Sequence, residues 1–146
     1  MVRFLFQAMV VCIVFIAAWR TGGKPERYVA TIYFVMLLAG CLHALLVPPS
    51  EPDNVDDVHQ FRAWLDTAAL VAVVLVAIGY DRWWTLWVGS VQFIAVMAHV
   101  LQAFQMPVPL AAYAVMERWP VWAAVLFTGI GTILHHRRTK AQHIDT

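Results

Sequence analysis

The stretch FRAWLDTAALVAVVLVAIGY at residues 61–80 is followed, after Asp81-Arg82, by WWTLWVGSVQFIAVMAHVLQAF at residues 83–104. Both runs reach the length of about 20 mostly apolar residues that lets one helix cross a bilayer. Neither run alternates apolar and polar residues with a period of two, which excludes the strands of a membrane barrel. The two runs therefore predict a pair of transmembrane helices joined by a very short link.

The same pattern continues on both sides of this pair. Two apolar runs precede it, and a shorter one follows it. The predicted fold class is all-α, a transmembrane helical bundle that forms one domain over 1–146, with four spanning helices as the alternative to five. The five spans are expected at about 2–19, 28–47, 61–80, 83–104 and 119–134.

The segment before the last run has two interpretations. Leu110–Met116 is apolar but too short to cross a bilayer, and charged residues follow it. We expect it to form a short interfacial helix (110–116), with a separate span after it. Pro120 then lies in the first turn of that span, where its missing N–H costs nothing. The alternative is one kinked helix over 109–134, and in both cases 135–146 is a cytoplasmic tail.

The composition requires lipid as a partner of the chain. Hydrophobic residues make up 62% of the sequence and charged residues 13%, and the mean hydropathy is +0.69. Soluble domains are about half apolar and about a quarter charged. A net charge of +1 without a basic stripe argues against nucleic acid as a partner. Cys12 and Cys41 lie within apolar runs, which favours neither a disulfide framework nor a metal site.

The distribution of basic residues predicts the orientation. With five crossings, one side of the membrane holds seven of the ten Lys and Arg residues, namely Arg20, Lys24, Arg27, Arg82, Arg137, Arg138 and Lys140. The other side holds Arg3, Arg62 and Arg118. The positive-inside rule places the richer side in the cytoplasm. We therefore expect an outside N-terminus and a cytoplasmic C-terminus.

Two further patterns concern the helix surfaces. Aromatic residues at the ends of the runs are expected to anchor the helices at headgroup level. On the cytoplasmic side these are Trp19, Tyr28, Tyr80, Trp83, Trp84 and Trp87.

Small residues in the last run predict a close helix contact, within the bundle or in an oligomer. They are Ala124, Thr128, Gly129, Gly131 and Thr132.

A polar cluster is predicted near the outer face. His43, Asp66 and His99 each lie about one turn inside the outer end of their run, which places all three roughly 6–8 Å below that boundary. Gln92 and Gln102 are expected to share one helix face with His99, because the spacings are seven and three residues. Polar residues within a membrane face other helices or a cavity. These five residues are therefore the candidate binding cluster.

The cluster allows three interpretations. It can hold the bundle together by hydrogen bonds between helices. It can bind a proton or an ion, since a His–Asp pair makes a proton relay and histidine titrates near neutrality. It can also hold a b-type haem on His43 and His99, because haem iron takes axial histidines. No cofactor is predicted, and haem is kept as an alternative.

One segment resembles known proteins. The stretch YDRWWTLWVGSVQF at 80–93, with His99 beyond it and AYAVM at 112–116, resembles small uncharacterised membrane proteins of alphaproteobacteria, particularly sphingomonads. The similarity covers roughly the C-terminal half of the chain. It implies a multi-pass protein of the bacterial inner membrane and implies no activity.

The function predicted from the sequence is non-enzymatic. No nucleophile motif, phosphate loop or zinc helix motif occurs in the chain. We expect an accessory or scaffold protein of an inner-membrane assembly, with a second copy or another membrane protein as partner. The alternatives are a proton or ion carrier or sensor that uses His43, Asp66 and His99, and a haem protein.

Overall fold

The computed structural model describes residues 2–47, 54–106 and 109–142, and its regular structure consists of helices. The all-α prediction is therefore confirmed over this part of the chain. The helices are α1 (Val2–Thr21), α2 (Lys24–Leu46), α3 (Asn54–Tyr80), α4 (Trp83–Ala103) and α5 (Leu110–Gln142).

Four of the helices, α1 to α4, are long and apolar enough to cross a membrane. Their outward faces carry large apolar side chains, and Leu45 and Ile78 are 81% and 77% exposed. Exposed apolar surface of this extent is unfavourable in water and favourable in lipid. The length, composition and surface of these helices are those of a membrane protein.

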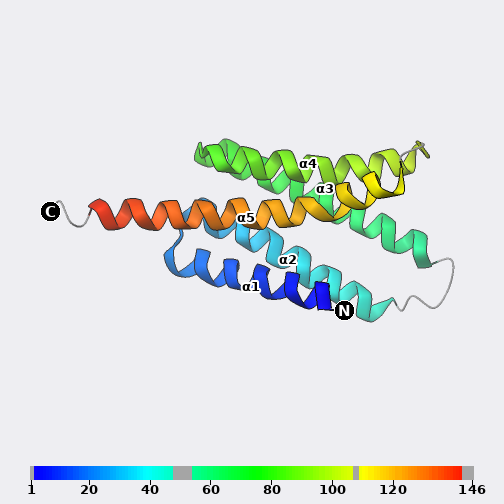
Figure 1. Ribbon diagram of the computed structural model, residues 1–146, viewed down its shortest axis with the longest axis horizontal. Helices are drawn as coiled ribbons and strands as arrows, with labels where there is room; N and C mark the ends of the chain where they lie inside the picture. Colours follow the sequence, from blue (N-terminus) through cyan, green and yellow to red (C-terminus); the bar gives the residue numbers. More distant parts are fainter. Residues whose placement is uncertain (1, 48–53, 107–108, 143–146) are drawn as a thin grey trace.

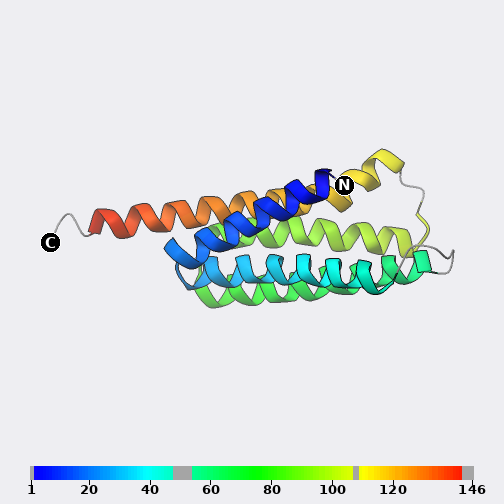
Figure 2. The ribbon, with the colours of Figure 1, turned by 90° about the horizontal axis from the view of Figure 1, so that it is seen from below.

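The helices form a bundle in which each contacts its neighbours in the chain and α1 also contacts α5 (Figure 1). In addition, α5 contacts α2, so α5 packs against α1, α2 and α4. We call the end of the bundle where α1 begins the N-terminal end, and the opposite end, toward which α5 runs, the C-terminal end. At the C-terminal end α5 extends well beyond the other helices (Figure 2).

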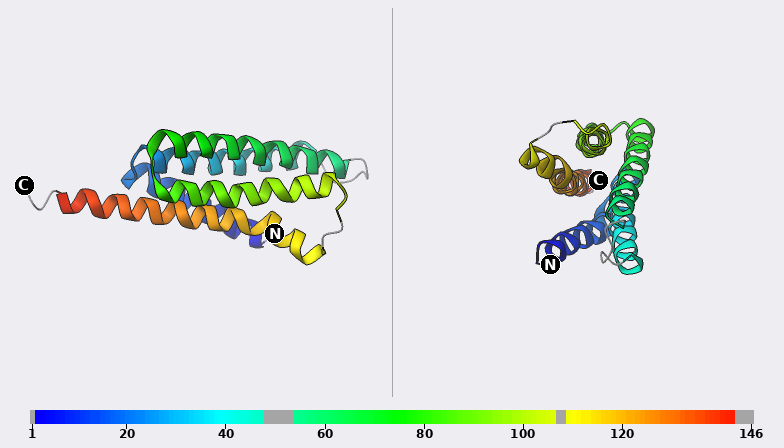
Figure 3. Two further views of the ribbon diagram at one scale, coloured as in Figure 1. Left: turned by 90° about the horizontal axis from the view of Figure 1, so that it is seen from above. Right: turned by 90° about the vertical axis from the view of Figure 1, so that its right-hand side faces the viewer.

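The structure differs from the expected division of residues 110–134. A single helix, α5, runs through the expected interfacial helix (110–116), through Pro120 and past Leu134 to Gln142. The alternative of one kinked helix is therefore correct, and its first turns are tilted from the axis of the remainder (Figure 3). Proline inside a helix removes one backbone hydrogen bond and bends the helix without ending it. Most of the expected tail (135–146) is helical, and 143–146 lies outside the described residues.

Two other helices are longer than their predicted apolar spans. The helix that contains the span predicted from residue 28 starts at Lys24, and Pro25 occupies its first turn. The helix that contains the span predicted from residue 61 starts at Asn54, as polar first turns extend it beyond the apolar run. The earlier start of α2 brings Glu26 into a helix instead of a loop. The α3–α4 link turns sharply at Asp81, whose φ of 49° lies in the left-handed region.

The small residues of α5 pack inside the bundle. Ala124, Thr128 and Thr132 are buried, and a Cβ added to Gly131 would lie 2.8 Å from Cε2 of the Trp84 indole. Trp84 itself is 3% exposed and belongs to the core. The expectation that Trp84 is a headgroup anchor is wrong, because its ring fills the space that glycine leaves on α5.

Gly131→Ala is predicted to destabilise the protein by about 1–3 kcal/mol, because the new methyl group overlaps the Trp84 ring. Gly79→Ala is the matched control, since no atom lies within 4 Å of its added Cβ, and it is expected to be neutral or mildly stabilising. Thermal unfolding midpoints in detergent micelles compare the two variants. Equal midpoints would contradict the close α4–α5 contact.

Candidate functional site

A hydrogen-bond network joins side chains from α2, α3 and α4. Nε2 of His99 lies 2.9 Å from Oδ2 of Asp66. The Gln92 amide donates to Oδ1 of Asp66 at 2.9 Å and to the Asp66 backbone carbonyl at 3.2 Å. The Tyr33 hydroxyl donates to Oε1 of Gln92 at 2.9 Å. The four residues therefore form one connected network.

The donors of this network converge on Asp66. Tyr33 donates to Gln92, Gln92 donates to Asp66, and the His99 nitrogen approaches the second carboxylate oxygen. Tyr33, Gln92 and His99 are all buried. A buried carboxylate requires hydrogen-bond donors or a positive charge, because its desolvation is otherwise costly. The arrangement thus supports a negative charge on Asp66.

The helix positions explain how these side chains meet. Gln92, Ala95 and His99 lie on one buried face of α4, with Ala95 small enough for a neighbouring helix to come close. Asp66 lies on α3, five residues after Phe61, where the apolar part of that helix begins. Tyr33 lies midway along α2 on its buried face. Three helices thus hold the network in place.

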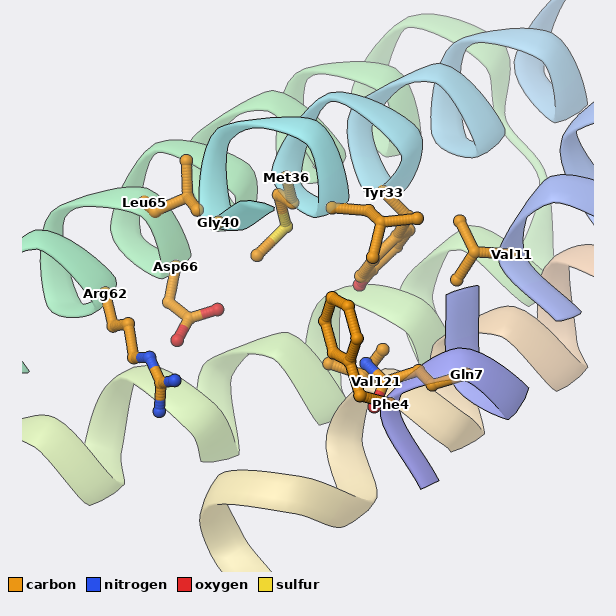
Figure 4. Close-up of a pocket in the computed structure, with 11 residues that line it drawn as sticks. Phe4, Gln7, Val11, Tyr33, Met36, Gly40, Arg62, Leu65, Asp66 and Val121 are labelled. Atoms are coloured by element: carbon orange, nitrogen blue, oxygen red, sulfur yellow. The ribbon is translucent and has the colours of Figure 1, made fainter. Parts of the chain in front are cut away.

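A pocket reaches Asp66 from one side of the network. Its volume is about 160 Å³, and Gln7, Tyr33, Arg62 and Asp66 supply its polar lining. In Figure 4 the Arg62 and Asp66 side chains extend from α3 and Tyr33 extends from α2 into the same region, with Phe4 and Gln7 of α1 opposite. The Asp66 side chain is 18% exposed and that of His99 is 7% exposed. Asp66 is therefore the member of the ion pair that faces the pocket more openly.

The structure brings together three of the five predicted residues. Asp66, Gln92 and His99 are in direct contact, as their shared depth and helix face predicted. His43 lies elsewhere, because its ring stacks on Phe61 with centroids 4.1 Å apart. Gln102 is exposed near the end of α4. Equal depth was therefore insufficient to bring His43 to Asp66, and the place of Gln102 in the cluster stays a prediction.

Tyr33 is the functional residue that the sequence analysis missed. The depth comparison included only His43, Asp66 and His99. Tyr33 lies within the apolar run 28–47 and therefore did not stand out. Its spacing held a signal, since Glu26, Tyr33 and Gly40 recur every seven residues on one helix face. His43 is ten residues beyond Tyr33 and so points about 80° away from it around the helix axis.

Among the described residues, no group of three or more His, Cys, Asp or Glu side chains is placed to hold a metal ion. Haem ligation by His43 and His99 would require His99 to leave Asp66 and His43 to leave Phe61. The haem alternative thus gains no support from these contacts.

Comparisons with known proteins give no family or relative. No protein-family model matches the chain, and neither the curated proteins nor the solved structures include a match. The chemistry of the site therefore has to be inferred from its own geometry.

Tyr33→Phe is predicted to destabilise the protein by about 1 kcal/mol, because it leaves the buried Gln92 oxygen without its donor. Tyr28→Phe is the control, since the Tyr28 side chain is 51% exposed at the surface, and a loss below about 0.5 kcal/mol is expected. Denaturant unfolding in mixed micelles measures both. A Tyr33 variant as stable as the Tyr28 variant would contradict the network.

Proposed function

We propose that the protein carries protons across a membrane, with Asp66 and His99 as the proton-binding pair. The observation that supports this proposal is the direct contact of a carboxylate with an imidazole inside an apolar bundle, beside a pocket that reaches the carboxylate. Ionisable groups within membrane helices mark proton and ion pathways in pumps and transporters. The conclusion is thus drawn from the site and not from a relative.

The chemistry follows from the charges that the pair can hold. A neutral imidazole beside an ionised carboxylate leaves one negative charge within the bundle. A proton arriving through the pocket cancels this charge, either on the carboxyl group or as an imidazolium ion paired with the carboxylate. Gln92 donates to Asp66 and Tyr33 holds the Gln92 amide in place in both states, since neither donor changes its own charge. Uptake and release of a proton thus require little movement of the helices.

We further propose five crossings, with the N-terminus outside and the C-terminus in the cytoplasm. The seven-to-three division of basic residues supports this orientation. The resemblance to small membrane proteins of alphaproteobacteria supports the bacterial inner membrane as the location. With this orientation, the Asp66 pocket faces the periplasm.

The accessory or scaffold role stays a prediction with less support. It relied on the small-residue face of α5 and on the aromatic faces as contacts for a partner. The small-residue face packs against other helices of the same chain, with Ala124 and Thr128 at 0% and 1% exposure. A partner would therefore have to use the exposed aromatic residues.

Proton flux into liposomes tests the proposed carrier function. The purified protein is reconstituted with a pH-sensitive dye inside, and a potassium gradient with valinomycin supplies the driving force. Asp66→Asn and His99→Gln are each expected to lower the flux by about tenfold or more, because removal of a proton-transfer group costs at least that much.

Two matched variants control for the loss of one acid or one histidine. Asp81→Asn changes an exposed acid in the α3–α4 link, and His43→Gln changes the histidine stacked on Phe61. Both are expected to keep wild-type flux. Equal flux through the wild type, Asp66→Asn and empty liposomes would exclude proton carriage.

Reporter fusions test the proposed orientation. A reporter that is active only in the periplasm, inserted between α2 and α3, is expected to be active. A fluorescent reporter that folds only in the cytoplasm, fused to the C-terminus, is expected to fluoresce, because the three crossings of α3, α4 and α5 separate the two positions. Both reporters in one compartment would contradict an odd number of crossings.

A further inference from the structure

A second acidic side chain is buried at the C-terminal end of the bundle. Glu26 lies in the first turn of α2 and is only 2% exposed. Its Oε2 atom has no hydrogen-bond partner among the residues that the structure describes. An ionised carboxylate in such a place is strongly unfavourable, whereas a protonated carboxyl group or one beside a cation is tolerated.

The surroundings of Glu26 provide a proton partner. A Cβ added to Gly23 would lie 3.0 Å from Glu26 Oε2 and 3.2 Å from Nδ1 of His135 on α5. The two titratable groups therefore lie beside the same glycine, whose missing side chain leaves them room. Arg27, the next residue of α2, is directed elsewhere, since its Nε donates to the Gly22 carbonyl at 3.1 Å. His135 is thus the titratable group that approaches Glu26 from a neighbouring helix.

Polar side chains of α2 and α5 lie between this end of the bundle and the Asp66 network. On α2, Tyr33 follows Glu26 by seven residues on the same buried face. On α5, Thr128 and Thr132 precede His135 on one face, and both threonines are buried. A cavity of about 10 Å³ lies between Tyr33 and Thr128, close to the smallest volume that holds one water molecule.

We propose that Glu26 and His135 form a second proton-binding pair, through which protons pass between the Asp66–His99 pair and the cytoplasm. This inference rests on the proposed carrier function and adds the step that connects the Asp66–His99 pair with the cytoplasmic side. Glu26 Oε2 has no direct hydrogen-bond partner among the described residues, so a water molecule has to join the two groups: the O–H bond of the Glu26 carboxyl breaks as the water takes that proton, and the water gives a proton to the His135 imidazole. His135 then releases its proton to cytoplasmic water, and a proton from the Asp66–His99 pair restores the Glu26 carboxyl group. The reverse sequence carries a proton outward, from the cytoplasm to the Asp66–His99 pair.

A purely structural role of Glu26 predicts different behaviour. A negatively charged side chain in the first turn stabilises a helix, because it interacts favourably with the positive end of the helix dipole. Glutamine keeps the shape of glutamate and loses the ability to exchange a proton. In the structural case Glu26→Gln therefore changes stability and leaves flux intact, whereas in the proton-transfer case flux falls while the fold is retained.

Proton flux and infrared spectroscopy test the inference together. Glu26→Gln and His135→Gln are each expected to lower the flux into liposomes by about tenfold or more. His136→Gln, the exposed neighbour in sequence, is the matched control and is expected to keep wild-type flux. The infrared spectrum of the wild type is expected to contain a protonated-carboxyl band near neutral pH that Glu26→Gln lacks. If Glu26→Gln does not fold, His135→Gln provides the flux result.

The outcomes separate this inference from the proposed function. Flux that is lost in Asp66→Asn and retained in Glu26→Gln and His135→Gln would overturn the second pair and leave the carrier function standing. Wild-type flux equal to that of empty liposomes would overturn both proposals. An infrared band unchanged by Glu26→Gln would overturn the protonated state of Glu26 independently of any flux.

Discussion

In a bundle with an apolar outer surface, each buried polar group must find its hydrogen-bond partner inside the protein. The hydroxyl groups of Thr128 and Thr132 meet this requirement locally by donating to the backbone carbonyl four residues earlier. Asp66 cannot do so, because a carboxylate only accepts hydrogen bonds. It therefore accepts hydrogen bonds from side chains of α4, and these bonds help to hold α3 against α4.

The same requirement connects stability with chemistry. The groups that satisfy Asp66 include a histidine, so the contact that stabilises this half-buried acid also forms the pair to which we assign proton exchange. The pocket beside Asp66 leaves this carboxylate accessible from within the bundle. At the other end Glu26 is the exception to the rule, since its Oε2 lacks a partner among the described residues. A buried acid without a partner is a candidate for chemistry, because structure alone does not account for it.

Much of the fold was predictable because lipid imposes simple limits on helix length and composition. Apolar runs gave the existence of α1 to α4, and depth along the runs brought Asp66 and His99 to one level. The helices extend beyond the predicted spans where polar residues continue them, as at the start of α2 and through Pro120 of α5. Hydropathy detects where a helix enters hydrocarbon, and hydrogen bonding decides where it ends.

The sequence by itself determined the helical class, the membrane-length runs and the position of each polar side chain along its run. Only the tertiary structure decided which side chains face inward, placing Tyr33 and Trp84 in the core and His43 on Phe61. The physical reason is that a helix apolar on all sides has no polar stripe to mark its outer face. Its rotation is decided by packing and hydrogen bonds with other helices, and these contacts exist only once the bundle has formed.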